Sequence, residues 1–367
     1  MKMWTVIVLV AVSSPAYAQL GGIARRAQQA QERKQQFDDL NVSEDEEKQI
    51  GADVSAKVRQ RFGVVQNAAV HKYVALVGSA LARQTDRPNL PWTFIVLDTD
   101  GVNAFAAPGG YVHITRGALA LIKTEAELAG VLGHEITHVT HKHTVNAIRK
   151  SKGVQLGANQ TLSSRAPFLD RIANRAYEMV LENEFDRGDE LDADNGGILL
   201  AQKLGYAPAA LASFLTRLDD RNRNQAERNG LFASHPATEE RVNKIKQVAG
   251  SQTGAVVAAR YTSTITYQPT ELTRIAVVTE GAAGVAGSGE DKSKAAPSKT
   301  TEPKKKGFGL GSLTKAVAPE KSSQQVAASG GARGVGPDRL AKGGDNPNLV
   351  KVSVSAEEVA TFKKGIV

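Results

Sequence analysis

The stretch from Glu125 to His143 constrains the fold of this chain more than any other feature. Apolar residues recur in it at helical spacing, glycines leave room for a neighbouring helix, and His134 and His138 stand four residues apart. On a helix these imidazoles share one face, about one turn apart, with Glu135 beside them. A buried helix needs partners for such polar groups, and a metal ion satisfies both histidines at once. We therefore predict a site for one zinc ion per chain on this motif helix.

Two histidines leave a catalytic zinc site one protein ligand short, because such sites usually hold three side chains and one water. A histidine further along the same helix does not supply the third zinc ligand. The extended pattern HExxHxxGxxH requires Gly at 141 and His at 144, whereas the chain has His141 and Thr144. We interpret His141 and the nearby His143 as surface groups or as supports for the site.

A carboxylate from a second helix is the other source of the third ligand. Two pairs of acidic residues are spaced four apart, Glu182 with Asp186 and Glu190 with Asp194. We favour the second pair, because Ala193 and the glycines at 196–197 allow one helix to approach another closely. Glu190 is then the predicted ligand, and Asp194 is placed to accept the outward N–H of a liganding histidine. The alternative is a solvated acidic helix face.

The body of the chain is predicted to be α+β and mainly helical. Apolar spacing indicates helices from Ser43 to Phe62 and from Asn67 to Arg83. Three short β-branched or apolar runs follow, at 92–97, 102–106 and 111–115. Helical spacing then resumes from Gly117 almost to Ala249. The motif helix is therefore expected directly after a small β-sheet.

The first 18 residues are predicted to form a cleavable signal peptide. Lys2 precedes a short apolar run, and Ala16-Tyr17-Ala18 has the small side chains of a cleavage site. The run is shorter than the ~20 residues that span a bilayer, and an uncleaved anchor is the alternative. The chain has no cysteine for disulfides or lipid attachment. We expect a protein of the bacterial periplasm.

Composition divides the remainder into segments with different expected structure. A lead-in at 19–42 precedes the body at 43–250, and a short β-rich appendage at 251–280, a basic low-complexity linker at 281–345 and a strand–helix segment at 346–367 follow it. Strands are expected at 256–267, 274–279 and 349–354, and a helix at 356–364.

The basic excess of the chain is concentrated in the linker. Formal net charge is +8, and Lys304-Lys305-Lys306 lies in a tract too poor in large apolar residues to form a core. We interpret this tract as a solvated tail, and its lack of interleaved aromatic residues argues against nucleic-acid binding. Attraction to an anionic membrane surface or a cell-wall polymer is the alternative.

Taken in order, these motifs resemble the M48 zinc metallopeptidases, a gluzincin family. The resemblance covers residues 43–249. Within the family the chain looks like the soluble periplasmic branch, because it lacks the transmembrane helices of the membrane-embedded members. The resemblance is carried by Asn103-Ala104-Phe105-Ala106, Pro108-Gly109-Gly110 with Thr115-Arg116-Gly117, the His134–His138 motif, Glu190–Asp194 with Gly205-Tyr206-Ala207-Pro208, and Ser234-His235-Pro236 followed by Arg241.

The resemblance implies a zincin-type peptidase domain that cleaves misfolded or misassembled envelope proteins. Zinc held by His134, His138 and Glu190 would activate water, with Glu135 as the general base. Extended or unfolded polypeptides are the implied substrates, with outer-membrane assembly machinery or a membrane surface as further partners. A metal-containing chaperone or assembly factor with little proteolytic activity is the competing hypothesis.

The resemblance also assigns roles outside the zinc ligands. Residues 110–115 would form an edge strand that pairs with an extended substrate, and Asn103 would support that strand or contact substrate. Arg241 and His235 are candidates for balancing the charge of the tetrahedral intermediate, against the alternative of a salt-bridging arginine beside a loop. His235 would also be able to occupy the open zinc position and keep the enzyme latent. The substrate-binding residues are predicted to be Asn103, Gly110, Tyr111, Val112 and His113.

Overall fold

The computed structural model of this chain describes residues 42–150, 166–182, 185–222, 239–271, 276–279, 325–328 and 347–366. Its helices are α2 (Glu44–Phe62), α3 (Ala68–Ala82), α4 (Arg116–Leu121), α5 (Glu125–Thr140), α6 (His143–Lys150), α8 (Ala166–Glu182), α9 (Arg187–Lys203), α10 (Ala210–Asn222), α12 (Glu239–Ala249), α13 (Ala258–Thr264) and α15 (Ala356–Lys364). Its strands are β1 (Thr93–Leu97), β2 (Ala104–Ala107), β3 (Tyr111–Thr115), β4 (Ala276–Thr279) and β5 (Gln325–Ala328), and η1 (Pro108–Gly110) is a short 3₁₀ turn. The predicted α+β class is confirmed.

The first two helices of the described residues begin at the polar residues that the sequence predicts. The hydroxyl of Ser43 accepts from the backbone N–H of Glu46, whose carboxylate accepts from the N–H of Ser43, so α2 opens with a capping box. The side chain of Asn67 accepts from two N–H groups in the first turn of α3. Local capping chemistry therefore fixes both starts.

The sheet ahead of the motif helix has the order β1-β3-β2, with β1 parallel and β2 antiparallel to β3. Tyr111 is paired with Thr93 on one side and with Ala107 on the other. The prediction that 110–115 forms an edge strand is therefore wrong, because both flanks of β3 are already hydrogen-bonded to neighbouring strands. The edge strands of this sheet are β1 and β2.

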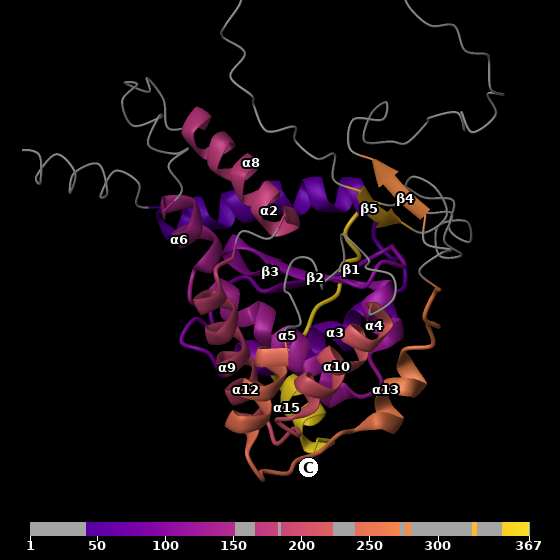
Figure 1. Cartoon of the computed structure of the whole chain (residues 1–367). Helices are drawn as coiled ribbons and strands as arrows, with labels where there is room; N and C mark the ends of the chain where they lie inside the picture. The colour runs from indigo at the N-terminus through magenta and orange to yellow at the C-terminus, as the bar shows by residue number, and fades with distance from the viewer. Residues whose placement is uncertain are drawn as a thin grey trace, which may run out of the picture.

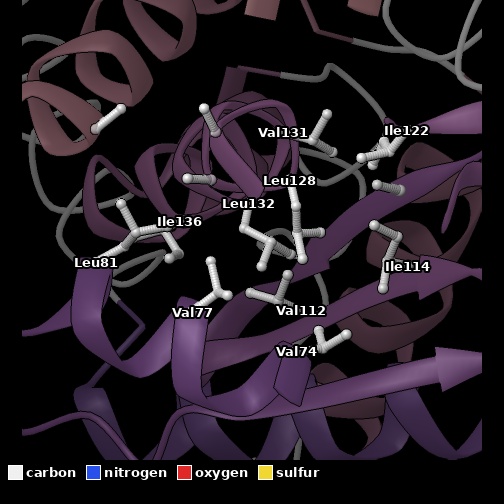
Figure 2. Close-up of a cluster of buried hydrophobic side chains, with 14 of the residues drawn as sticks. Val74, Val77, Leu81, Val112, Ile114, Ile122, Leu128, Val131, Leu132 and Ile136 are labelled. Carbon is white, nitrogen blue, oxygen red and sulfur yellow. The ribbon is translucent and has the colours of Figure 1, made fainter. Parts of the chain in front are cut away.

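The sheet separates two apolar cores, because successive side chains on a strand point to opposite faces. In Figure 1, α2 and α8 lie above the sheet, and α3 and α5 lie below it. Ile95 and Leu97 join the upper core, whereas Phe94 and Val96 join the lower one. Figure 2 shows the lower core, where α3, β3 and α5 contribute Val74, Val77, Leu81, Val112, Ile114, Leu128, Leu132 and Ile136.

Every residue of α5 is buried, and glycines let its neighbours come close, as predicted. A Cβ on Gly197 of α9 would lie 2.8 Å from the backbone nitrogen of His134. A Cβ on Gly133 would lie 3.0 Å from the Cα of Gly197, and one on Gly130 would lie 2.9 Å from Leu211 of α10. Helices α9 and α10 therefore pack directly against the backbone of the motif helix.

The strand predicted at 256–267 is wrong, because residues 258–264 form helix α13. Tyr261 and Ile265 are four residues apart and both are buried in the lower core. Arg260 donates to the buried carboxylate of Glu125 at the start of α5, where Tyr73 and Tyr206 also donate. This segment is therefore built into the body.

The last described segment also packs against the body. Helix α15 lies where a helix was predicted, and Val359, Phe362 and Ile366 are buried in the lower core against α3. Lys72 forms an ion pair with Glu358, at 2.7 Å. Residues 349–354 were predicted as a strand, but they are not part of a sheet.

Several predictions concern the ends and the linker. The signal peptide at 1–18 and all but the last residue of the lead-in at 19–42 lie outside the described residues, as does most of the linker at 281–345. Within it, residues 325–328 form β5, which pairs with β4. Among the described residues, none of the helices has the length and apolar character needed to cross a bilayer.

Candidate metal centre

The structure brings three predicted ligands together at the contact between α5 and α9. The Nε2 atoms of His134 and His138 lie 3.1 Å apart. Glu190 places Oε2 3.6 Å from Nε2 of His134 and Oε1 3.5 Å from Nε2 of His138. All three side chains are buried. Two helices distant in sequence therefore direct three donor atoms at one point.

This donor set fits a divalent metal ion such as zinc. Ligands at zinc's usual bond lengths of about 2.0–2.2 Å lie about 3.3 Å from one another in a tetrahedron. The observed separations of 3.1, 3.5 and 3.6 Å, the last two to different oxygens of Glu190, lie near that value. Two imidazole nitrogens and one carboxylate oxygen also suit zinc chemically. A cation between them would satisfy all three buried groups at once.

Asp194 supports the first histidine from behind. Its Oδ1 lies 3.0 Å from Nδ1 of His134, one turn after Glu190 on the same helix. An N–H at Nδ1 that donates to this carboxylate leaves the lone pair of Nε2 directed at the metal position. Burial raises the pKa of Asp194, but hydrogen bonds from Arg241 and His134 outweigh it and lower that pKa overall. The carboxylate is therefore charged at neutral pH.

The second histidine is supported by His143, for which the sequence left a surface or a supporting role open. Nδ1 of His143 lies 3.0 Å from Nδ1 of His138, and Nε2 of His143 lies 3.1 Å from Oδ2 of Asp192. With Nε2 of His138 directed at the metal, its Nδ1–H donates to His143, which in turn donates from Nε2 to Asp192. Burial lowers the pKa of His143 despite Asp189 and Asp192 nearby, which keeps this ring neutral and able to accept.

The position of His143 depends on a break that the spacing did not predict. Helix α5 ends at Thr140, and Lys142 has φ 57°, in the left-handed region. In an uninterrupted helix, a residue five positions after His138 would lie on a different face. The break turns α6 so that the side chain of His143 contacts His138. Of the two roles expected for His143, the structure therefore shows the supporting one, in a buried position.

Arg241 from α12 lies behind the acidic residues of α9. Its Nε and Nη2 donate to Asp194 at 2.8 and 2.7 Å, and its Nη1 lies 2.9 Å from Oε2 of Glu190. All three guanidinium nitrogens therefore contact carboxylates. This geometry corresponds to the salt-bridging alternative. The predicted general base, Glu135, is buried on α5 next to His134 in the sequence, and its charge also acts on Arg241.

The predicted substrate-binding residues have other contacts in the structure. His113 points to the upper core, where its Nε2 lies 3.0 Å from Oγ of Ser55 and its ring stacks on Phe105. Burial lowers its pKa to about 3, so it stays neutral. Asn103 is buried, and its backbone N–H donates to Oγ1 of Thr115. The substrate role of 110–113 as an edge strand is thus not supported by the sheet.

Two further groups of candidate residues are the other acidic pair, Glu182 with Asp186, and the loop histidine His235. Asp186 is the N-cap of α9 and accepts from the N–H of Asp189 at 2.9 Å. Among the described residues, Glu190 is the acidic residue grouped with His134 and His138. Helix α8 ends at Glu182. His235, the candidate latency ligand, lies outside the described residues.

Residues 68–249 match peptidase family M48. The chain is 28% identical over 201 residues to the putative beta-barrel assembly-enhancing protease of Vibrio cholerae serotype O1, which covers 52% of this chain and 42% of that protein. It is 25% identical over 224 residues to the beta-barrel assembly-enhancing protease of Escherichia coli K12, covering 58% and 45%. It is 26% identical over 217 residues to the mitochondrial metalloendopeptidase OMA1 of Schizosaccharomyces pombe, covering 58% and 64%. The match spans less than half the length of the two bacterial relatives.

Proposed function

Because this chain belongs to peptidase family M48 through residues 68–249, we propose that it is a zinc-dependent endopeptidase of the bacterial periplasm. Its proposed substrates are misfolded or misassembled envelope proteins in extended conformations. The observation that carries the proposal is the convergence of His134, His138 and Glu190 within ligand spacing, with Glu135 next to the first histidine.

In the proposed mechanism, Glu135 moves the protons. A zinc ion at this site would supply activation of water, by lowering its pKa to about 7, and polarisation of the peptide carbonyl. Glu135 takes a proton from the attacking water and delivers it to the departing amine nitrogen. Its position, one residue after a ligand on a rigid buried helix, fixes the carboxylate relative to the reacting carbonyl.

Asp194, His143 and Arg241 position the ligands in this proposal. Asp194 and His143 each hold the outward nitrogen of one liganding histidine. Arg241 holds Glu190 and Asp194 together and offsets the charge of two buried carboxylates. We therefore assign Arg241 to ligand positioning and not to charge stabilisation of the tetrahedral intermediate.

Strand β2 is the better candidate for pairing with substrate. The outer edge of β1 is occupied near its end by a bridge from Val64 to Leu97 and a hydrogen bond from Val65 to Val96. Strand β2 packs against α5, and its outer edge pairs with no strand in the described part of the chain. Its residues are buried, so a substrate would need that edge to be uncovered before β-augmentation.

The envelope setting draws on the relatives. Two of them are named beta-barrel assembly-enhancing proteases, and the sequence begins with the features of a secretory signal. These names support polypeptides of the outer-membrane assembly pathway as substrates or partners. A chaperone or assembly factor with little proteolysis is the alternative, and the presence of Glu135 favours the enzyme because a metal scaffold does not need a general base.

The test compares degradation of unfolded casein by the wild type, Glu135→Gln and Glu357→Gln, with zinc content measured in each. Glu357 is exposed on α15, so it provides the same chemical change far from the site. We expect Glu135→Gln to keep its zinc and lose about 10²–10⁴-fold in rate, while the control is unaffected. Equal rates for all three would eliminate this mechanism, and no turnover by any of them would favour the chaperone.

A further inference from the structure

A second cluster of metal-binding groups lies beside the first at the outer end of the motif helix. It consists of His141, at the C-terminus of α5, His143, at the start of α6, and Asp192 of α9. Oδ2 of Asp192 contacts Nδ1 of His141 and lies 3.1 Å from Nε2 of His143. One donor atom from each residue lies within 4.8 Å of the other two. Asp189 adds an oxygen 3.9 Å from Nε2 of His143.

The backbone break at Lys142 is what creates this cluster. Two residues separated by one position point to nearly opposite sides of a helix. The left-handed conformation of Lys142, with φ 57°, turns the chain so that both histidines face the same carboxylate. The Nζ of Lys142 lies 3.2 Å from the buried carboxylate of Glu47, which anchors the turn to α2. The convergence is therefore a feature of the fold.

The chemistry of the cluster favours a cation over simple ion pairing. One oxygen, Oδ2 of Asp192, contacts a ring nitrogen of each histidine, so the donor atoms already converge. Two imidazoles around one carboxylate form the donor set that binds zinc and similar divalent ions. His141 and Asp192 are partly exposed, with side-chain exposures of 44% and 47%, so an ion can enter from solvent. Exposure also means weaker binding than at the buried centre.

We propose that His141, His143 and Asp192 form a second divalent-cation site whose occupation weakens the catalytic zinc site. The site would fill only when free zinc is abundant and would then act as an inhibitory sensor. The existence of this second site stands on its own geometry, whereas the inhibition rests on the proposed peptidase function.

The antagonism follows from the position of the His143 ring, which joins His138 to Asp192. When Nε2 of His143 binds a cation, the hydrogen it carried moves through solvent to Nδ1. That atom lies 3.0 Å from Nδ1 of His138, which carries a hydrogen when its own Nε2 faces the first metal position. Two N–H groups then point at each other, and His138 loses its acceptor. Loss of such a support typically lowers metal affinity 10–100-fold. By linkage, the first ion weakens the second by the same factor.

Metal stoichiometry tests the site without reference to catalysis. Protein lacking a histidine tag is dialysed against rising free zinc, and bound zinc is measured by elemental analysis. We expect two ions per chain for the wild type and for the control Asp53→Asn, a partly exposed position on α2, and one for His141→Ala and Asp192→Asn. Saturation of the wild type at one ion, or two ions retained by His141→Ala, would overturn the proposal.

A second experiment tests the antagonism. Release of the tightly bound ion to a chelating dye is followed after preloading with one or two equivalents of zinc. We expect release to be about 10–100-fold easier at two equivalents in the wild type and unchanged in His141→Ala. Casein degradation should fall at excess zinc in the wild type alone. Equal release and equal inhibition in both proteins would refute the coupling. Two ions with coupled release but no degradation at any zinc level would refute the proposed function and leave the site intact.

Discussion

Substitution of Gly197 by alanine separates packing from ligand chemistry at the metal centre. The new methyl group would lie 2.8 Å from the backbone nitrogen of His134 and 3.1 Å from the carbonyl carbon of Gly133. The first distance is 0.6 Å short of the 3.4 Å at which ordinary contact begins. Both opposing atoms are backbone, so α5 and α9 must move apart as units.

That displacement is large for a metal site. Zinc ligands hold their distances within about 0.2 Å, and Glu190 is carried by α9 whereas both histidines are carried by α5. We expect Gly197→Ala to lower zinc affinity about 10–100-fold, comparable to loss of a supporting contact. Overpacking should also cost about 1–3 kcal/mol in the free energy of unfolding, offset by about 1 kcal/mol from better helix propensity.

Zinc affinity is measured by competition with a chelating dye, and stability by thermal unfolding of the metal-free protein. Gly188→Ala is the matched control, because Gly188 lies on the exposed first turn of α9 and its Cβ would meet only the side chain of Asp186. The control should bind zinc as the wild type does. Wild-type zinc affinity in Gly197→Ala would refute the argument that close helix contact sets the ligand geometry.

Three further changes test other parts of the structure. Glu190→Gln should lose zinc in elemental analysis while Glu182→Gln keeps it, and the reverse result would reassign the third ligand. Burial raises the pKa of Glu47, but Arg87, Gly109 and Lys142 outweigh burial and lower that pKa overall. The ionised Glu47 therefore stabilises the folded protein above about pH 4.5, and this contribution is lost as the pH falls through the lower pKa of the folded state. Denaturant unfolding should therefore separate Glu47→Gln from the wild type at pH 7 and bring the two together in acid; a gap that persists would contradict this. Phe362→Ala should cost about 3 kcal/mol in urea unfolding, and no change would show that α15 does not contribute to the core.

Local patterns in the sequence were enough to predict the centre of the molecule. The spacing of His134 and His138 and the glycines of α5 and α9 act over one or two helical turns, where periodicity is a direct consequence of helix geometry. The choice of Glu190 over Glu182 also depended on a local feature, the small residues beside it. Within the described part of the chain, Glu190 lies within ligand spacing of both histidines.

The incorrect predictions concern features that sequence periodicity does not encode. The order of strands in a sheet depends on which distant segments pair, so the central place of β3 could not be read from residues 111–115. A short segment such as 258–264 satisfies both strand and helix patterns, and only burial of Tyr261 and Ile265 on one side identifies the helix. The choice between the two roles expected for His143 also stayed open, because its contact with His138 depends on the left-handed conformation of Lys142, and a lysine does not mark such a conformation as a glycine would.

The shared guanidinium of Arg241 determines how many helices this metal centre requires. The planar guanidinium of this α12 residue contacts the carboxylates of both the predicted ligand Glu190 and the supporting Asp194 on α9. A lysine, with a compact ammonium, lacks the fork that spans both. Any attempt to graft the centre onto another scaffold must therefore import three helices, because a two-helix transplant would leave a pair of negative groups repelling each other in a dry interior.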